Sequence, residues 1–369
     1  MSPYNEDIPS ILRLLSIKGI GPQIARKLIN TYGSADNIFS ADTRELLLLG
    51  KIGNAIIEAR SDSKLSSRAD QIINWSISNQ IKIIHYNDKE YPYRLKECED
   101  APLLVYYRGQ NVLNRKYIVS VVGTRNSSHY GRSLAERLMR GLSTIKEDLL
   151  IVSGLAYGTD INAHREAMNN GIPTVGVLAH GLDRIYPESH RQSAIAMLEA
   201  GGLLTEYPNS TNPDKGNFLA RNRIVAGMAD ATIVIESPNK GGSIVTANIA
   251  YSYQREVMAF PGRVGDMRSE GCNGLIRRQK ASMITSAEDL IEAMGWDRPI
   301  SKPIQKKLQF DGDSNSRTIV TLLEKEDELS LNQLAGLSGL NVAQLTSILM
   351  DLEMDDIVLA LPGKRYRLM

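Results

Sequence analysis

Residues 215–262 decide the fold, and they read KGNFLARNRIVAGMADATIVIESPNKGGSIVTANIAYSYQREVMAFPG. Within them lie two short apolar runs, at 232–235 and 257–260. Runs of this kind are typical of parallel strands that are buried on both faces. A helix-forming segment precedes each run, and a turn containing Gly or Pro follows it. The stretch therefore predicts a βαβ unit of a parallel sheet.

The same unit carries groups suited to an anionic ligand. The Gly-Gly-Ser turn at 241–243 allows backbone amides at a helix start to approach a phosphate. Lys215, Arg221 and Arg223 add positive charge upstream, and Phe218 offers an aromatic stacking surface between them. Together these features predict a site for a nucleotide or a phosphate-bearing polymer.

The pattern of strand, turn and helix begins well before this stretch. Further apolar runs lie at 117–122, 149–153, 174–178 and 203–206. Strands that alternate with helical segments predict a doubly wound, Rossmann-like and mainly parallel α/β sheet, whose ligands bind at the carboxyl ends of the strands. Those ends carry Gly123, Arg125, Gly154, Gly158, Glu206 and Gly242.

The turn after the first of these strands argues against a dinucleotide cofactor. It reads Gly123-Thr124-Arg125, and no GxGxxG follows any predicted strand. The P-loop pattern GxxxxGK[ST] is absent as well. One fixed arginine suits a single phosphate better than an extended pyrophosphate. We therefore expect an anion site and no cofactor.

Composition limits where nucleic acid can bind and where the protein acts. The formal charge is +1, from 43 basic and 42 acidic residues, so a contact with nucleic acid must be a local patch. Cys98 and Cys272 lack CxxC spacing, which argues against a structural disulfide or a zinc site. Since there is neither a signal-peptide pattern nor an apolar run of membrane-spanning length, we expect a cytoplasmic protein without a membrane contact.

Some acidic and histidine side chains are candidates for chemistry. Asp160 and His164 lie four residues apart at a helix start and are a catalytic pair, metal ligands, or an N-cap or first-turn acid with a structural partner. The last interpretation is favoured. Glu206 and Glu236 at strand ends either act as bases or orient the arginines Arg125 and Arg223. No metal ligands and no catalytic residues are assigned.

A helical module is predicted over residues 8–60. It contains two copies of helix, glycine turn and helix, with the turns at 19–21 and 50–53. The pair resembles helix-hairpin-helix modules, which hold nucleic-acid backbones through the amides of the turn. Lys18 and Lys51 beside the turns would then reach phosphates. A small helical protein-interaction module, in which the glycines only permit tight hairpins, remains equally open.

A winged helix is predicted at the C-terminal end, after a linker at 299–316. Helical patterns at 318–324, 331–337 and 342–354 precede a hairpin centred on 362–365. The segment 342–354, in the position of a recognition helix, contains no Arg or Lys, whereas helices that read the major groove carry cations and amides. Protein interaction is therefore favoured over sequence-specific duplex binding. The wing residues Lys364, Arg365 and Arg367 leave a weak phosphate contact open.

Six strings in the central region together resemble the DprA/Smf (DNA-processing protein A) family. They are GTR at 123–125, SGLAYGTD at 153–160, VLAHGLDRIYP at 177–187, FLARNRIVAGMAD at 218–230, GGSIVTANIA at 241–250 and MAFPG at 258–262. The resemblance implies a bacterial single-stranded DNA-binding protein that protects incoming strands in natural transformation and loads the RecA recombinase onto them. It further implies a homodimer, and a single-strand-binding protein is considered as a further partner.

The central region also resembles the lysine-decarboxylase-like (LOG) phosphoribohydrolases, so a nucleotide hydrolase is the alternative. Those enzymes carry PGGxGTxxE, whose terminal Glu takes part in the reaction. Here residues 238–248 read PNKGGSIVTAN, with small or neutral residues where that Glu is expected. A pocket without the acid binds phosphate but lacks the group that transfers a proton. A non-enzymatic DNA-binding protein is therefore the preferred interpretation.

The expected organisation is a helix-hairpin-helix domain at 1–70, a connecting extension at 71–115 that packs on the sheet, a Rossmann-like DNA-binding domain at 116–298, the linker, and a winged helix at 317–369. The residues expected to contact DNA are Gly123, Thr124, Arg125, Gly154, Lys215, Asn217, Phe218, Arg221, Asn222, Arg223, Gly242, Ser243 and Thr246.

Overall fold

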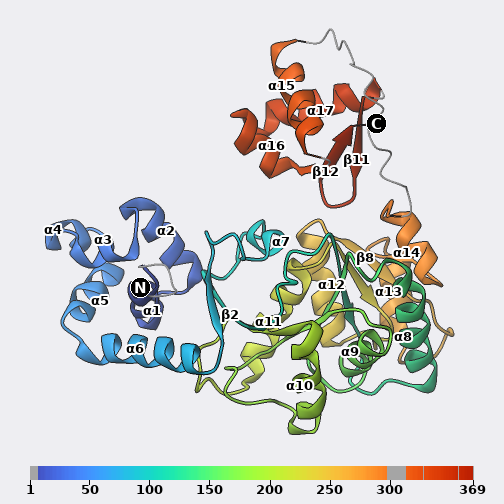
Figure 1. Cartoon of the computed structure of the whole chain (residues 1–369), viewed down its shortest axis with the longest axis horizontal. Coiled ribbons are helices and arrows are strands. Elements are labelled where there is room, and N and C mark those ends of the chain that lie inside the picture. Colours follow the sequence, from blue (N-terminus) through green and yellow to red (C-terminus); the bar gives the residue numbers. More distant parts are fainter. Residues whose placement is uncertain (1–6, 297–312, 327, 356, 369) are drawn as a thin grey trace.

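The computed structural model describes residues 7–296, 313–326, 328–355 and 357–368. A helical N-terminal module, a central α/β module and a winged helix follow one another along the chain (Figure 1). Most of the linker predicted at 299–316 lies outside the described residues.

One mostly parallel sheet organises the centre of the molecule. Among the described residues, nine strands pair in the order β1-β2-β6-β5-β4-β3-β7-β8-β9, and only the pairs β1–β2 and β2–β6 are antiparallel. The doubly wound prediction is confirmed, with the chain reversing direction across the sheet at β3 and β7. The strands are β1 (Lys82–His85), β2 (Leu104–Gly109), β3 (Tyr117–Val122), β4 (Leu149–Ser153), β5 (Thr174–Val177), β6 (Gly202–Thr205), β7 (Ala231–Val234), β8 (Glu256–Ala259) and β9 (Ser282–Met283).

Helices cover both faces of this sheet because successive strand residues point to opposite sides. In β3, Ile118 and Val122 pack on one face, and Val119 and Val121 pack on the other. Ser120 lies between them in sequence and is buried, but its hydroxyl is hydrogen-bonded to that of Thr232 at 2.7 Å. One face carries α8 (His129–Leu142), α9 (Thr159–Asn169), α10 (Arg191–Ala200) and α14 (Ala287–Ala293), and the other carries α11 (Lys215–Gly227), α12 (Gly242–Ser252) and α13 (Glu270–Arg277).

The N-terminal helices share a core with one edge of the sheet. Ile83, Leu104 and Tyr106 on β1 and β2 belong to the same buried cluster as the N-terminal helices. The expected boundary at residue 70 falls inside α6, and the extension joins the sheet through β1 and β2, with the short helix α7 (Tyr93–Lys96) between them. The helices are α1 (Ile8–Ser16), α2 (Pro22–Tyr32), α3 (Ala35–Ser40), α4 (Thr43–Leu47), α5 (Lys51–Arg60) and α6 (Ser63–Ser78).

The C-terminal winged helix has the predicted form. Its helix α17 (Val342–Met354) coincides with the predicted segment 342–354. The other elements are α15 (Ser314–Lys325), β10 (Leu329–Ser330), α16 (Leu331–Ser338), β11 (Val358–Leu361) and β12 (Arg365–Leu368). The β11–β12 hairpin points toward the central module (Figure 1).

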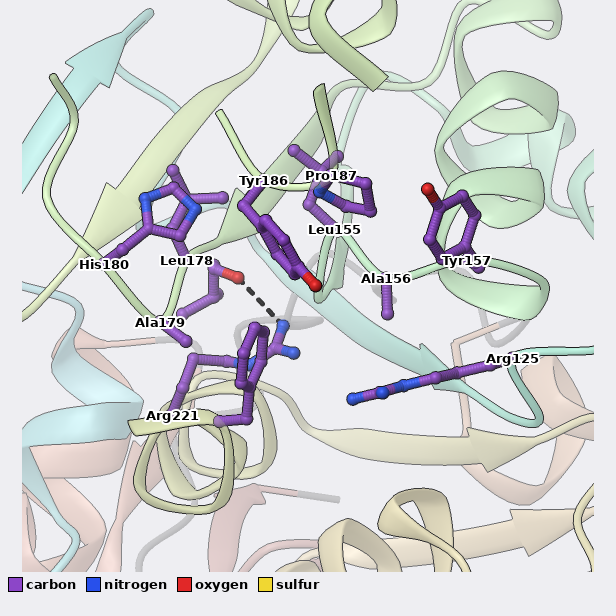
Figure 2. Close-up of a pocket in the computed structure, with 12 residues that line it drawn as sticks. Arg125, Leu155, Ala156, Tyr157, Leu178, Ala179, His180, Tyr186, Pro187 and Arg221 are labelled. Carbon is purple, nitrogen blue, oxygen red and sulfur yellow. Dashed lines mark hydrogen bonds between the residues drawn. The ribbon is translucent and has the colours of Figure 1, made fainter. Parts of the chain in front are cut away.

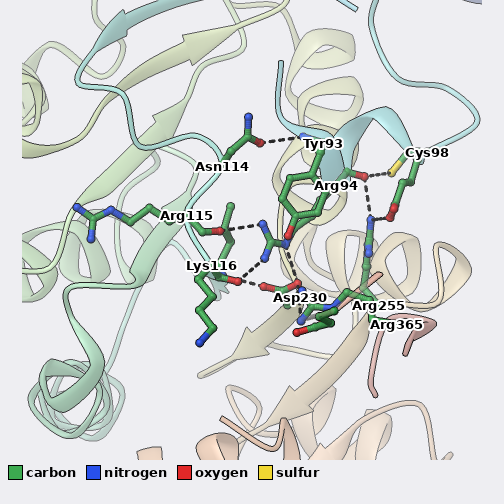
Figure 3. Close-up of polar contacts among 12 residues, drawn as sticks. Tyr93, Arg94, Cys98, Asn114, Arg115, Lys116, Asp230, Arg255 and Arg365 are labelled. Carbon is green, nitrogen blue, oxygen red and sulfur yellow. Dashed lines mark hydrogen bonds and ion pairs between the residues drawn. The ribbon is translucent and has the colours of Figure 1, made fainter. Parts of the chain in front are cut away.

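An ionic cluster connects this hairpin with the central module (Figure 3). Buried Asp230, which precedes β7, accepts a hydrogen bond from Nε of Arg94 at 2.6 Å and from the amide of Ile118 at 2.8 Å. Arg365 lies 3.8 Å from Asp230 and 2.6 Å from Glu328. Its side chain is only 12% exposed, so Arg365 is turned inward rather than toward a phosphate. Asp230 directly precedes β7, so this contact lies at the amino end of that strand. The amino ends of the parallel strands lie on the side of the sheet opposite their carboxyl ends.

Candidate nucleic-acid interface

Two adjoining pockets lie at the carboxyl ends of the parallel strands. The first, which we call the glycine pocket, lies between the turn after β3 and the start of α12. The second, which we call the aromatic recess, is enclosed by the segments after β4 and β5 (Figure 2). Both pockets are lined by Arg125, Ala156, Phe218 and Arg221, so a ligand that fills one can extend into the other.

Arg125 is the accessible cation of this site. It follows β3 in the turn with Gly123 and Thr124, which also line the glycine pocket, and its side chain is exposed. Its guanidinium lies 5.7 Å from the ring centroid of Phe218, a distance at which a cation is attracted to an aromatic face. Among the residues that the structure describes, Arg125 forms no ion pair within 4.0 Å, so its guanidinium is accessible to a ligand.

The start of α12 supplies hydrogen-bond donors to the glycine pocket. Gly241 occupies the N-cap position, where it provides no side-chain acceptor for the first amides of the helix. The amides of Gly242 and Ser243 therefore remain available, as the first amides of a helix do without a cap. The Ser243 hydroxyl donates to Ser237 at 2.7 Å, and that of Thr246 donates to the Gly242 carbonyl at 3.0 Å. Ser243 thus offers a bound anion its amide rather than its hydroxyl hydrogen.

Arg221 and Asp160 form the floor of the glycine pocket. Arg221 is 5% exposed, and it donates to the carbonyl of Val177 at 2.9 Å (Figure 2). Burial lowers the pKa of Arg221 and raises that of Asp160, and the two opposite charges counteract both effects. A Cβ atom on Gly154 would collide with both side chains, so only glycine allows this close approach. The floor therefore contains a cation and an anion together.

Helical spacing separates the remaining predicted residues on α11. Lys215, Phe218 and Asn222 are three or four residues apart and share a face, whereas Arg223 is two residues from Arg221. Asn222 lines the glycine pocket, and Lys215 is exposed at the first position of the helix. The amide group of Asn217 donates to the carbonyl of Asn212 at 3.2 Å.

Arg223 lies outside both pockets. Its guanidinium binds the Glu206 carboxylate and the Asp100 carbonyl. Burial raises the pKa of Glu206, and the charge of Arg223 opposes that change. Glu206 was expected to orient Arg125 or Arg223, and in the structure it pairs with Arg223. A contact of Arg223 with DNA stays a prediction, and it would require this ion pair to open.

The family model for DNA recombination-mediator protein A matches residues 82–295. The chain belongs to this family. A SAM-like helix-hairpin-helix tandem matches residues 11–59, and a DprA winged helix domain matches residues 305–364. The modules on either side of the central sheet therefore have the identities that the sequence predicts.

Relatives of known name support the assignment to this family. The chain is 36% identical to the DNA processing protein DprA of Streptococcus pneumoniae, over 66% of this chain and 86% of that protein. It is 28% identical to Protein Smf of Synechocystis, over 95% of this chain and 96% of that protein. The similarity thus extends to nearly the whole length of a relative.

Solved structures agree with the fold. An X-ray structure of DNA processing protein A from Streptococcus pneumoniae superposes with a TM-score of 0.61 at 33% identity, covering 76% of this chain and 95% of that one. A structure of DNA processing protein A from Helicobacter pylori, described for its single-stranded DNA binding mode, gives 0.53 at 29% identity and covers 60% and 98%. Within the described ranges of our chain, no helix has the length and apolar content needed to span a membrane.

The candidates His164 and Glu236 form hydrogen bonds within the fold. His164 is fully buried and bonds to the hydroxyl of Thr174 at 2.7 Å and the carbonyl of Gly154 at 2.6 Å. Burial lowers the pKa of His164 to about 4, so the ring is neutral near pH 7. Glu236 accepts hydrogen bonds from the amide of Ser128, at 2.9 Å, and from its hydroxyl, and so supports the start of α8. In the described part of the chain, no group of His, Cys, Asp or Glu is arranged to hold a metal ion.

Sequence reasoning missed the aromatic recess. Its walls include Tyr157, His180 and Tyr186, and the ring of Tyr186 lies 5.9 Å from that of Phe218. These residues come from two separate segments that only the sheet brings together. The string VLAHGLDRIYP at 177–187 contains two of the three, but its spacing alone does not indicate a pocket.

Proposed function

We propose that this chain is a non-catalytic protein that binds single-stranded DNA in the glycine pocket. The proposal rests on three features of this pocket: the exposed cation Arg125, the free amides at the start of α12 and the aromatic ring of Phe218. Phosphate contacts with a stacking surface suit a strand whose bases are unpaired, and they require little readout of sequence. The relative from Helicobacter pylori, described for its single-stranded DNA binding mode, supports the proposal.

We assign the contacts as follows. Arg125, Lys215, Arg221 and Arg223 would contact phosphates, although Arg221 and Arg223 are held by protein partners in the unbound state. Phe218 would stack on a base. The remaining contacts, from backbone or small polar groups, would come from Gly123, Thr124, Gly154, Asn217, Asn222, Gly242, Ser243 and Thr246.

The cellular role we propose is protection of incoming strands in the cytoplasm and loading of the RecA recombinase during natural transformation and homologous recombination. One pocket grips few nucleotides, so useful affinity requires two pockets on one strand, and this favours a homodimer. A single-strand-binding protein is a further partner. The family assignment supports this role.

Loading can be tested with RecA on strands coated by single-strand-binding protein. The intact chain is expected to accelerate the DNA-dependent ATPase of RecA on such strands. Arg125→Ala should reduce this acceleration in proportion to its loss of strand affinity. If the wild-type chain binds the strands and RecA assembly is not accelerated, DNA binding stands and the loading role falls.

Hydrolysis of nucleotides is the alternative that an experiment must exclude. The turn before α12 carries no acid, and the acid that lines the glycine pocket is buried Asp160 beside Arg221. Incubation with nucleoside monophosphates is therefore expected to release no base. Release that Asp160→Asn abolishes would replace our proposal with that of an enzyme.

A further inference from the structure

The loop between β6 and α11, residues 206–214, connects the N-terminal module with the DNA site. Arg68 on α6 donates from its guanidinium to the backbone carbonyl of Asn209 at 2.5 Å and to the side-chain oxygen of the same residue at 3.1 Å. The Arg68 side chain is half-buried, and its partner lies far away in the sequence. This contact therefore holds the β6–α11 loop against the N-terminal module.

The β6–α11 loop in turn holds the segment that follows β5. The amide of Gly181 donates to the carbonyl of Thr211 at 3.3 Å, and the amide of Ser210 donates to the Asp183 carboxylate at 2.9 Å. A Cβ atom on Gly181 would lie 2.5 Å from the carbonyl oxygen of Pro208, so only glycine allows the two backbones to pack this closely. A shift of the loop therefore shifts the segment as well.

Leu182 adds an apolar contact to the same connection. Its side chain packs against the buried cluster of the N-terminal helices. It also packs against a second cluster, which contains Leu155 and Leu178 from the wall of the aromatic recess. Because packed cores have little free space, a side chain that contacts both clusters transmits a shift of one to the other.

The connection reaches Phe218, the proposed stacking ring, from two sides. Tyr186 belongs to the segment after β5, and its ring centroid lies 5.9 Å from that of Phe218. On the other side, the side-chain amide of Asn217 donates to the carbonyl of Asn212 in the β6–α11 loop at 3.2 Å. Asn217 directly precedes Phe218 on α11. The loop therefore holds two neighbours of the ring.

We propose that Arg68 is a positioning residue for strand binding, which fixes the place of Phe218 through the β6–α11 loop and does not contact DNA itself. The proposal rests on the proposed function and adds that the N-terminal module preorganises the DNA site of the central module. A site that is already ordered binds more tightly, because ordering it during binding costs conformational entropy. Loss of the Arg68 contacts should therefore weaken binding without removing a phosphate contact.

Arg68→Met is the test variant, because Met keeps much of the apolar stem and removes the guanidinium. In fluorescence anisotropy with oligothymidylate, the affinity should fall by roughly 2- to 10-fold, the range of an ordinary hydrogen bond. The salt dependence should stay unchanged, whereas loss of a phosphate contact would make its slope shallower by about 0.7. Lys64→Met is the matched control, because Lys64 is exposed on the same helix and lines neither pocket, and it should keep the wild-type affinity.

A double-mutant cycle shows whether Arg68 acts through Phe218. Effects of independent sites add, whereas residues that act as one unit are not additive. In the Phe218→Ala background no ring remains to be positioned, so Arg68→Met should cause no further loss of affinity.

Hydrogen exchange without DNA measures the connection itself. Amides in residues 178–187 and 206–214 should exchange faster in Arg68→Met than in the wild-type chain or in Lys64→Met, because a segment with fewer contacts opens locally more often. Leu182→Ala removes the apolar contact of the same connection. If Arg68→Met does not fold, Leu182→Ala should give the same weaker binding, unchanged salt dependence and faster exchange.

The outcomes separate this inference from the proposed function. Wild-type affinity in the folded Arg68→Met variant overturns the positioning role and leaves single-strand binding intact. A shallower salt slope, or losses that add in the Phe218→Ala background, would also refute it, because Arg68 would then act on DNA directly or independently of the ring. Unchanged exchange in the two segments refutes the connection through the loop. If the wild-type chain binds no strand, the proposed function fails and this inference fails with it.

Discussion

Replacing Arg125 by Ala should weaken single-strand binding without unfolding the protein. The side chain is exposed and its guanidinium lies 5.7 Å from the ring centroid of Phe218, so its removal uncovers little core. Buried Asp160 keeps the opposite charge of Arg221 beside it. A hydrogen bond to a charged group contributes about 1.5–3 kcal/mol. This corresponds to roughly 10- to 150-fold in the dissociation constant. The salt dependence of binding should become shallower by about 0.7 for each phosphate contact that is lost.

The assay is a titration of labelled oligothymidylate at several salt concentrations, with thermal unfolding of the same samples. Arg140→Ala is the matched control, because it removes the same charge from an exposed position on α8 that lines neither pocket. Arg140→Ala should change the strand affinity by less than about twofold, because a single exposed charge contributes little free energy. A folded Arg125→Ala variant with wild-type affinity and an unchanged salt slope would remove Arg125 from the site and refute the assignment.

Three more predictions concern the rest of the molecule. Deletion of residues 311–369 should leave the strand affinity largely intact in filter binding, because the hairpin contacts the amino ends of the strands, opposite the pockets. A loss of affinity larger than that of Arg125→Ala would show that the winged helix binds DNA. Arg223→Ala should lower the free energy of unfolding in urea by about 3 kcal/mol, since Glu206 is left buried without its cation, and a loss of affinity without this destabilisation would make Arg223 a DNA contact. Burial lowers the pKa of His164 from 6.5 to about 4, so the unfolded state takes up the proton first as pH falls. Between pH 7.5 and 5.5 this removes about 1.4 kcal/mol of stability, and His164→Gln should show a correspondingly smaller loss over that interval; an equal loss in both proteins would contradict the lowered pKa.

Periodicity alone located most of the central elements. The apolar run 149–153 is the buried strand β4, and 342–354 is α17, because strands buried on both faces and amphipathic helices leave strong signals in the residue pattern. Ligands of doubly wound sheets bind at the carboxyl ends of the strands. The sequence therefore also predicted that Gly123, Arg125 and the start of α12 lie together there.

The side-chain partners of the arginines depend on tertiary contacts, and hydrophobic periodicity does not predict such contacts. Arg221 and Arg223 look equivalent in sequence, but two residues on a helix differ by about 200° in direction, so one enters the pockets and the other meets Glu206. Arg365 looked available to phosphate, but the hairpin turns it toward Glu328 and Asp230. In each case the deciding partner lies far away in the sequence.

Competition between single and double strands tests the central claim most directly. Oligothymidylate and the duplex that it forms with oligodeoxyadenylate would be titrated at the same salt concentration against the intact chain. Our account predicts that the single strand binds at least about tenfold more tightly, because its bases are free to stack and the phosphate charge per strand is the same. Equal affinity for the two forms would contradict it, and would point instead to duplex recognition by the terminal modules.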